Sequence, residues 1–330
     1  GVLIDQYEKE ETLFVKPEYV KVLSQFPVKE YLPIFEARKN EILSQDMDAK
    51  EQKHLTLELR YLTQIINKYE TRKSHKFVGE EEPSKLFLTV PRGLEEILGN
   101  AITTMPVKVM KDGVLVECDD MKKLDEVRCF GEALHLLAGL ADVSANDKEI
   151  GNAITKAHVL DYLDDRHIGD DSYRFRLEVR GIPAEDKQAF VKKCAQSIEI
   201  ASKHRLVNSV SDYEIEFRIM MKRTGKVTIF LKLFTREDPR FSYRNHDLSS
   251  SLRPYIGALI CQYIAPYVRD KARVLDPFCG LGTLLHERNF VKHCDTLYGV
   301  DISQNAIDWA KEESKVLGLP VHYINKDCLG

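Results

Sequence analysis

Hydrophobic residues in the N-terminal part of the chain recur with the spacing of an α-helix. One set follows alternating four- and three-residue steps, and it comprises Leu55, Leu59, Leu62, Ile66 and Tyr69. Such a set forms a single buried helical face, and residues 28–43 show a similar pattern. A polar stretch that contains glycine and proline interrupts the helical pattern over residues 74–84. We therefore predict a helical N-terminal region and linker over residues 1–83.

From residue 84 onward the pattern changes to short strand-like segments separated by helical ones. In chain order it predicts a strand, a helix, a hairpin that turns at Asp112-Gly113 and a second helix, over residues 85–90, 93–102, 107–118 and 121–140. A charged and polar stretch at residues 158–171 is a candidate boundary. The order predicts a small two-layer α+β domain over residues 84–165.

Strict alternation returns at Tyr173, where apolar residues occupy one face of a predicted strand and charged residues the other. A helix over residues 185–203 and strands over residues 213–219 and 226–231 follow. This order predicts a second compact α+β domain over residues 166–240.

Positive charge is concentrated in this second α+β segment. Between Ser172 and Arg244 the chain has sixteen Lys or Arg against nine Asp or Glu, whereas the formal charge of the whole chain is −4. The rest of the chain is therefore acidic, and a charge summed over all residues conceals a basic region.

Residues 241–330 alternate between helical and strand patterns, which is typical of a parallel sheet flanked by helices. A predicted helix over residues 254–267 precedes the first strand. The predicted strands cover residues 273–276, 297–300 and 321–325, and a carboxylate stands at or just after the end of each: Asp276, Asp301 and Asp327.

A glycine-rich turn follows the first of these strands. The sequence Val-Leu-Asp-Pro-Phe-Cys-Gly-Leu-Gly-Thr covers residues 274–283, and its two glycines remove side chains that would keep a ligand away from the backbone. In a parallel α/β sheet, ligands bind beyond the carboxyl ends of the strands. We therefore predict a cofactor site at this edge of the sheet.

The acids indicate which cofactor fits. A dinucleotide fingerprint requires a third glycine three residues after Gly282, and that position is Leu285. S-adenosyl-L-methionine suits three acids better, with its amino-acid part near Asp276, its ribose at Asp301 and its adenine near Asp327. The predicted contacts are Asp276, Pro277, Cys279, Gly280, Gly282, Thr283, Asp301, Ile302, Asp327 and Cys328. The plainer interpretation is that Asp276-Pro277 only turns the chain.

Residues 276–283 resemble the first motif of the RNA guanine-N2 methyltransferases that carry a THUMP domain, a class I S-adenosylmethionine-dependent family. The segment Val-Pro-Arg-Gly-Leu-Glu-Glu-Ile-Leu at residues 90–98 is similar to the opening of their N-terminal ferredoxin-like domain. Tyr243-Arg244 and Leu252-Arg253-Pro254 are similar to the stretch that introduces their catalytic domain. The resemblance covers about residues 85–330.

This resemblance implies an α+β and α/β multidomain fold. It places a ferredoxin-like domain at residues 84–165, a THUMP RNA-binding domain at residues 166–240 and the N-terminal part of a Rossmann-like methyltransferase domain at residues 241–330. Methyl transfer to the exocyclic N2 of a guanosine in structured RNA, either tRNA or rRNA, is the implied reaction.

The basic region supports an RNA partner, because Lys and Arg neutralise phosphates. The candidate RNA contacts are Arg174, Arg176, Lys192, Lys193, Arg218, Lys222, Arg223 and Lys226. For any one of them, a solvated strand or helix face is an equally good interpretation. Two other hypotheses stay open: methyl transfer to adenine N6 of DNA or RNA, which uses a similar glycine motif, and a non-catalytic RNA-binding protein with an incomplete methyltransferase fold.

The family places its catalytic loop, Asp or Asn followed by Pro-Pro and an aromatic residue, after the fourth strand of the sheet. This sequence contains no Asp-Pro-Pro or Asn-Pro-Pro, and it ends at Gly330, just after the third predicted strand. We therefore expect catalytic residues beyond Gly330 and a sheet with one unfinished edge. On this expectation the 330-residue chain binds the cofactor weakly and transfers no methyl group.

Composition bears on the compartment of the protein and on metal binding. Without a long apolar run or a basic-then-apolar leader, the expected compartment is the cytoplasm and no membrane partner is expected. The seven cysteines are scattered and never spaced as Cys-x-x-Cys, so we expect reduced thiols and no metal site. The helical region at residues 1–83 is a candidate surface for a protein partner.

Overall fold

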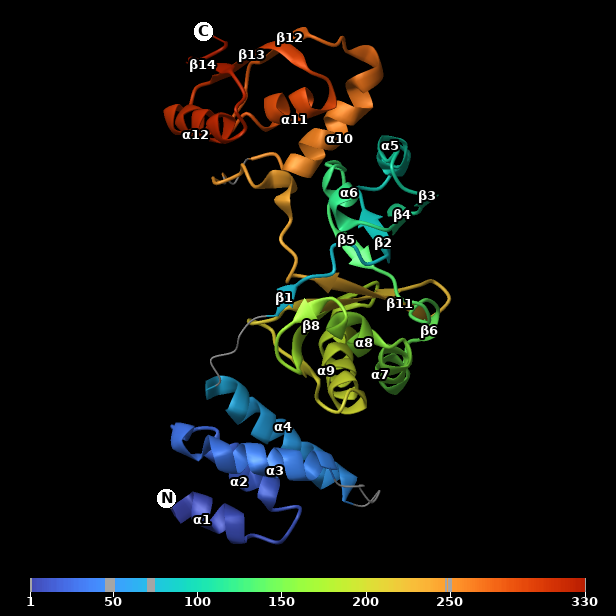
Figure 1. The fold of residues 1–330 in the computed structure, drawn as a ribbon, viewed down its shortest axis with the longest axis vertical. Helices are drawn as coiled ribbons and strands as arrows, with labels where there is room; N and C mark the ends of the chain where they lie inside the picture. The colour runs from blue at the N-terminus through green and yellow to red at the C-terminus, as the bar shows by residue number, and fades with distance from the viewer. Residues whose placement is uncertain (1, 45–50, 70–74, 247, 249–250, 330) are drawn as a thin grey trace. The chain divides into compact units, whose positions relative to one another are not determined.

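The computed structural model describes residues 2–44, 51–69, 75–246, 248 and 251–329 (Figure 1). The chain forms two compact units, each made of two chain segments. The first unit comprises Gly1–Lys76 and Asp142–Thr228, and the second comprises Phe77–Ala141 and Ile229–Gly330. The protein is a multidomain chain of mixed α+β and α/β type, as predicted.

The first unit begins with helices, which confirms the helical pattern. They are α1 (Val2–Lys9), α2 (Lys16–Leu23), the short 3-10 helix η1 (Lys29–Tyr31), α3 (Leu32–Ser44) and α4 (Gln52–Tyr69). Their shared core includes Phe35, Ile42, Leu55, Leu59, Leu62 and Ile66. Four of the five residues that predicted the buried helical face are thus buried, and the side chain of Tyr69 lies outside the described residues.

The rest of the first unit packs helices against a parallel set of strands. Its elements are β6 (Val143–Ser144), α7 (Asp147–Lys156), α8 (Val159–Asp164), β7 (His167–Ile168), β8 (Tyr173–Arg180), α9 (Ala184–Ala201), β9 (Leu206–Asn208) and β10 (Ile215–Met221). β8 pairs in parallel with both β9 and β10. Phe175 and Phe217 meet across this pairing with ring centroids 5.4 Å apart. β8, α9 and β10 match the predicted elements closely, whereas β9 was not predicted.

The limits of this unit differ from the predicted boundary at residues 165 and 166. α7 packs on α9, and at Gly151 the helices approach so closely that a Cβ would lie 2.6 Å from the carbonyl oxygen of Ser197. The stretch at residues 158–171 holds α8 and β7 because its apolar residues Val159 and Leu163 are buried. The ferredoxin-like and THUMP assignments stay predictions.

The upstream part of the second unit is an antiparallel sheet with short helices. Its elements are β2 (Ser84–Thr89), α5 (Glu95–Ala101), β3 (Val107–Met110), β4 (Gly113–Cys118), α6 (Met121–Asp125), β5 (Ala133–His135) and η2 (Pro239–Phe241); β1 (Lys76–Phe77) precedes them. β11 (Lys226–Leu233) starts in the first unit and ends in the second. The strand order is β3-β4-β2-β5-β11. The hairpin turn places Asp112 at a φ of 63°, one residue before Gly113 begins β4.

The helix predicted over residues 121–140 is wrong beyond its first turns. α6 ends at Asp125, and β5 pairs with β2 in the stretch that was predicted to be helical. The backbone carbonyl of Thr89 accepts the Gly131 amide at 2.8 Å, and the Thr89 hydroxyl accepts the Glu132 amide at 2.9 Å. Pairing with a distant strand therefore overrides the local helical pattern.

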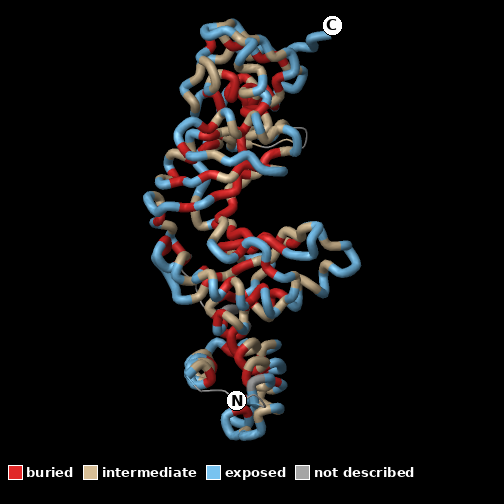
Figure 2. The backbone as a smooth tube through the Cα atoms, turned by 90° about the vertical axis from the view of Figure 1, so that its right-hand side faces the viewer, coloured by how far each residue is buried: buried red, intermediate tan, exposed pale blue. Residues whose placement is uncertain are grey.

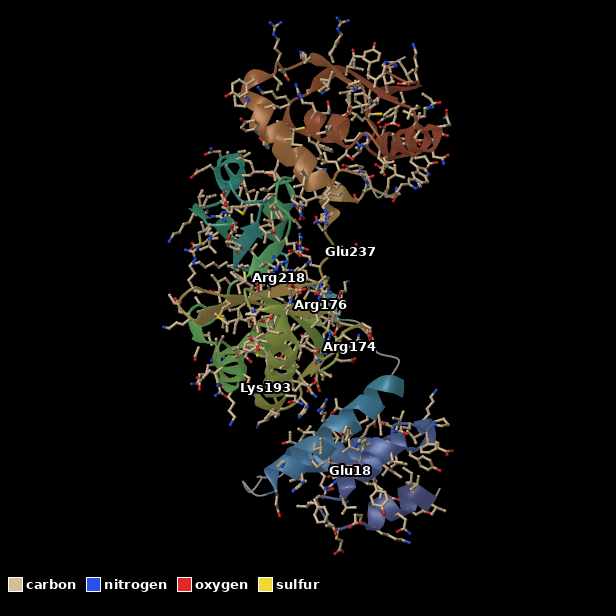
Figure 3. All side chains as sticks on the ribbon, turned by 180° about the vertical axis from the view of Figure 1, so that it is seen from behind. Glu18, Arg174, Arg176, Lys193, Arg218 and Glu237 are labelled. Atoms are coloured by element: carbon tan, nitrogen blue, oxygen red, sulfur yellow. The ribbon has the colours of Figure 1, made fainter. Side chains whose placement is uncertain are left out.

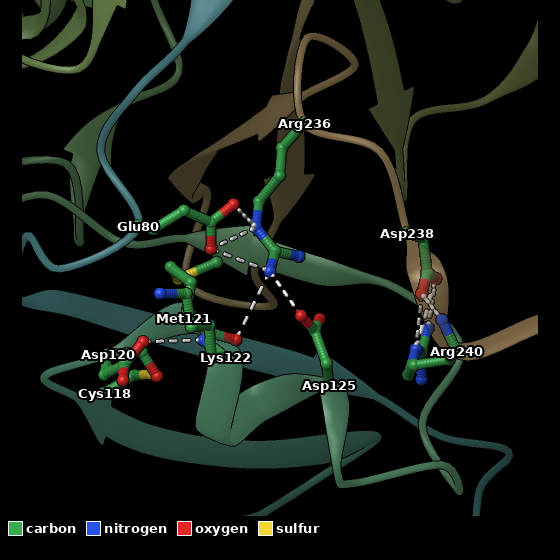
Figure 4. Close-up of polar contacts among 9 residues, drawn as sticks. All are labelled: Glu80, Cys118, Asp120, Met121, Lys122, Asp125, Arg236, Asp238 and Arg240. Atoms are coloured by element: carbon green, nitrogen blue, oxygen red, sulfur yellow. Dashed lines mark hydrogen bonds and ion pairs between the residues drawn. The ribbon is translucent and has the colours of Figure 1, made fainter.

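Charged side chains of Glu80, Asp125 and Arg236 form a cluster in this part of the second unit (Figure 4). Arg236, which follows β11, donates to Asp125 of α6 at 2.7 Å and to Glu80 at 3.1 Å. Arg240 of η2 pairs with Asp238 at 2.7 Å and stacks over Phe130. These contacts fasten the chain after β11 to α6.

The C-terminal part of the second unit is a parallel sheet flanked by helices. Its elements are α10 (Pro254–Ile264), η3 (Ala265–Tyr267), β12 (Ala272–Asp276), α11 (Thr283–Val291), β13 (Cys294–Asp301), α12 (Gln304–Val316) and β14 (Val321–Asn325). The strand order is β12-β13-β14, with both pairs parallel, as predicted. Figure 2 shows its buried residues in red, and they include Leu285, Leu297 and Ile307. β12 forms one edge of this sheet, and its Leu275 is 62% exposed.

No helix within the described ranges combines the length and apolar character needed to cross a membrane.

Candidate functional site

Carboxylates gather at the carboxyl edge of the parallel sheet. Asp276 ends β12 and pairs in register with Gly299 of β13, while Asp301 ends β13 and pairs with Asn325 of β14. Asp327 follows the end of β14, and its side chain accepts the Leu329 amide at 2.9 Å. The three acids that the strand pattern predicted thus stand at or just after the carboxyl ends of three adjacent strands.

The amides of the glycine turn are engaged within the protein. The Phe278 amide donates to Asp276 Oδ1 at 3.1 Å, and the Gly280 amide donates to Asp301 Oδ2 at 2.9 Å. Cys279 donates to the carbonyl of Val300, and Gly282 donates to the carbonyl of Cys279. A phosphate-binding turn keeps its amides available for an anion. This turn instead directs two of its amides toward carboxylates.

The electrostatics of the turn favour a ligand with positive charge. Burial, together with the negative charge of Asp301, raises the pKa of Asp276. A cation beside Asp276 would stabilise its charged form, whereas a phosphate would add to the repulsion. Burial raises the pKa of the Cys279 thiol to about 12, so this cysteine is a neutral packing group.

The two glycines of the turn have different roles. Gly280 has a φ of 50°, and a Cβ on it would meet nothing within 4 Å, so open space adjoins the backbone there. Gly282 has a φ of 76°, and a Cβ on it would lie 2.3 Å from the hydroxyl of Tyr323. Gly280 therefore leaves room beside the turn, while Gly282 allows β14 to pack beneath it.

The other predicted cofactor contacts divide between the surface and the interior. Pro277, Ile302 and Cys328 are exposed at the carboxyl edge, and Ile302 is 72% exposed. Thr283 is buried, and its hydroxyl accepts a hydrogen bond from Arg244. Thr283 thus supports the turn from the protein side, and its predicted cofactor contact would have to be made by its backbone.

Sequence reasoning missed a buried polar group beneath the turn. The Ser314 hydroxyl lies 2.8 Å from both Tyr323 OH and His286 Nε2, and His286 is completely buried. Burial lowers the pKa of His286 to about 4, so its ring is neutral. His286 Nδ1 has no hydrogen-bond partner within the described residues. The sequence signal was weak, because the three residues lie on separate elements.

A second missed group connects three segments of the second unit. The carboxylate of Glu287 on α11 is 0% exposed and receives two hydrogen bonds of 2.8 Å from Arg128. It also accepts the Tyr243 hydroxyl at 2.9 Å. Glu287 therefore joins α11 to the segment between α6 and β5 and to the chain that follows η2.

The candidate RNA contacts all lie in the first unit and fall into three groups: three paired arginines, one paired lysine and four exposed residues. Arg174, Arg176 and Arg218, which are labelled in Figure 3, form ion pairs with acids on or beside β10. The Arg218 side chain is only 3% exposed. The geometry favours an internal, structural use of these arginines. Lys222 pairs with Asp142 at 2.6 Å. The exposed residues are Lys192 and Lys193 on α9, and Arg223 and Lys226 near the turn between β10 and β11.

Comparisons with known proteins locate the fold. No family model matches the chain, and no curated protein matches it. A predicted N6-adenine-specific DNA methylase from Listeria monocytogenes is similar in structure, with 16% identity and a TM-score of 0.56 over 74% of this chain and 75% of that one. TrmN from Thermus thermophilus is similar over 74% and 73%, with 19% identity and a TM-score of 0.54. SMU.472, solved in complex with SAH, is similar over 74% and 76%, with 12% identity and a TM-score of 0.52. The chain therefore shares the fold of these proteins.

Proposed function

We propose that this protein is an S-adenosylmethionine-dependent RNA methyltransferase. The observation that carries the proposal is the glycine turn. Its Phe278 amide donates to the carboxylate of Asp276, and its Gly280 amide donates to the carboxylate of Asp301. The cofactor supplies a methyl group activated by a positively charged sulfur. Asp276 would face the amino-acid part, Asp301 the ribose hydroxyls and Asp327 the adenine. The complex of SMU.472 with SAH supports this choice of ligand.

We further propose an RNA substrate, with guanosine N2 in tRNA or rRNA as the methylated atom. The exposed basic residues of the first unit support RNA binding, because Lys and Arg neutralise the phosphates of the RNA backbone. The second candidate is adenine N6 in DNA or RNA, and the structural similarity to a predicted N6-adenine-specific DNA methylase favours it. Tighter binding of tRNA than of duplex DNA with the same number of phosphates would support the RNA substrate, and the reverse order would support DNA.

The cofactor assignment predicts a large effect of Asp301→Asn. Loss of the carboxylate charge is expected to weaken S-adenosylhomocysteine binding about 20-fold, since hydrogen bonds to charged groups contribute about 1.5–3 kcal/mol. Isothermal titration calorimetry measures the dissociation constant. The matched control is Asp295→Asn, which changes an exposed acid at the other end of β13.

Two outcomes would contradict the cofactor assignment. Equal dissociation constants for Asp301→Asn and the unchanged protein would show that Asp301 does not contact the ribose. Binding of NAD⁺ in preference to S-adenosylhomocysteine would show a dinucleotide site instead.

The RNA assignment predicts that Lys192→Gln/Lys193→Gln weakens tRNA binding about tenfold. Each lost phosphate contact also reduces the slope of log affinity against log salt by about 0.7–0.9. Fluorescence anisotropy with labelled tRNA at several salt concentrations measures both quantities. Lys311→Gln/Lys315→Gln on α12 removes the same charge and is expected to leave the slope unchanged. Equal slopes for the two double variants would argue against α9 as an RNA contact.

A further inference from the structure

Helix α11 starts without a side-chain cap of its own. Its N-cap residue is Gly282, which has a left-handed conformation and no side chain that could accept an amide. The first helical residue, Thr283, is buried, and its hydroxyl accepts a hydrogen bond from the guanidinium of Arg244. The end of the glycine turn is therefore held by a residue that lies 39 positions earlier in the chain.

Arg244 is itself fixed from two sides. Its Nε donates to the carbonyl oxygen of His246 at 3.0 Å and lies 3.8 Å from Oε1 of Glu313 on α12. Glu313 is 0% exposed, and its Oε2 has no hydrogen-bond partner within the described residues. A buried carboxylate is costly unless a positive group lies beside it. Arg244 provides that charge, so Glu313 holds the guanidinium against Thr283.

The chain around Arg244 is anchored to the same helices. The His246 ring stacks on Trp309 of α12 with centroids 4.8 Å apart, and its Nε2 lies 2.8 Å from Glu312. On the other side, the Tyr243 hydroxyl bonds to Glu287 of α11. Residues 243–246 thus contact α11 and α12, the helices that follow the two strands ending in Asp276 and Asp301.

We infer that Arg244 is a positioning residue for the cofactor: it fixes Thr283, and through Thr283 the glycine turn, without touching the ligand. The inference rests on the proposed function, because the turn is the proposed cofactor site. Groups that are held in the bound geometry before binding lose less entropy when the ligand arrives. Without Arg244 the protein would have to order the turn at the moment of binding.

Calorimetric titration with S-adenosylhomocysteine tests the inference. Arg244→Met is expected to raise the dissociation constant about tenfold, and Arg244→Lys, which keeps a charge beside Glu313, is expected to recover part of the loss. Thr283→Val removes the accepting hydroxyl at nearly constant volume and is expected to have a similar effect. The double variant Arg244→Met/Thr283→Val is expected to bind no more weakly than Arg244→Met, because both changes remove the same hydrogen bond.

Arg288→Met is the control for a merely structural role. Arg288 is buried at the opposite end of α11, where its guanidinium donates to the carbonyls of Lys292 and Arg269. This change is expected to lower the melting temperature. At temperatures where the variant is folded, its dissociation constant for S-adenosylhomocysteine is expected to equal that of the unchanged protein. An unchanged dissociation constant in both Arg244→Met and Thr283→Val, or additive losses in their double variant, would overturn the inference.

Amide hydrogen exchange separates this inference from the proposed function. Residues 279–284 are expected to exchange faster in Arg244→Met and Thr283→Val than in the unchanged protein, and at the original rate in Arg288→Met. Failure of the unchanged protein to bind S-adenosylhomocysteine would refute the proposed function, while exchange would still report on the turn. Unchanged exchange in the first two variants shows that Arg244 does not position it.

Discussion

Gly282→Ala is expected to lower the free energy of unfolding of the second unit by about 3 kcal/mol and to abolish measurable cofactor binding. An added Cβ would lie 2.3 Å from the Tyr323 hydroxyl and 3.2 Å from His286 Nε2. Tyr323 cannot withdraw without losing its hydrogen bond to Ser314. The left-handed φ of 76° adds backbone strain for any residue with a side chain.

Urea denaturation followed by the fluorescence of Trp309, the single tryptophan, measures this effect in the second unit. Gly318→Ala is the matched control, because Gly318 lies in the same unit, has a left-handed φ of 63°, and a Cβ there would meet nothing within 4 Å. The control is expected to cost only the backbone strain, about 1 kcal/mol. Adding Tyr323→Phe to Gly282→Ala is expected to restore part of the stability. Equal costs for the two alanine variants would show that packing beneath the turn contributes nothing.

Arg128→Met is expected to destabilise the second unit by about 3–5 kcal/mol, because it leaves the carboxylate of Glu287 buried without its positive partner. The Glu287 side chain is 0% exposed, and the guanidinium of Arg128 also stacks 3.9 Å from the ring centroid of Phe290. The same Trp309 transition reports the change.

A surface pair in the same unit provides the control for Arg128→Met. Lys123→Met removes the partner of Asp119, and the side chains of this pair are 40% and 68% exposed. Solvent screens exposed pairs, so the stability of the control is expected to stay near that of the unchanged protein. Adding Glu287→Gln to Arg128→Met removes the buried charge and is expected to recover part of the loss. Destabilisation of less than 1 kcal/mol by Arg128→Met would contradict the buried-charge argument.

The elements with the clearest sequence periodicity were predicted well. β8 alternates apolar and charged side chains, and α4 repeats leucines along one face; both patterns are set by local geometry. The parallel sheet was predicted for the same reason, since each strand is a short apolar run that ends in a polar turn. The positions of Asp276 and Asp301 followed from the ends of those strands.

Features that depend on distant contacts could not be predicted. Residues 133–135 form β5 because they pair with β2 and β11. Their local sequence does not distinguish them from a continuation of the preceding helix. Arg174 and Arg176 were assigned to RNA because they belong to the basic region, although the pairing of β8 with β10 brings them next to Glu214 and Glu216. The contact between Arg244 and Thr283 likewise joins positions far apart in the sequence.

The division of the second unit into two chain segments has a consequence for folding order. Leu140 and Ile229 lie on either side of the intervening segment Asp142–Thr228, yet the Ile229 amide donates to the Leu140 carbonyl at 2.9 Å. During synthesis β2 and β5 emerge long before the part of β11 that pairs with β5. Until that part arrives, β5 presents an open edge to other chains. If the intervening segment folds first, its own structure shortens the loop that β11 must close.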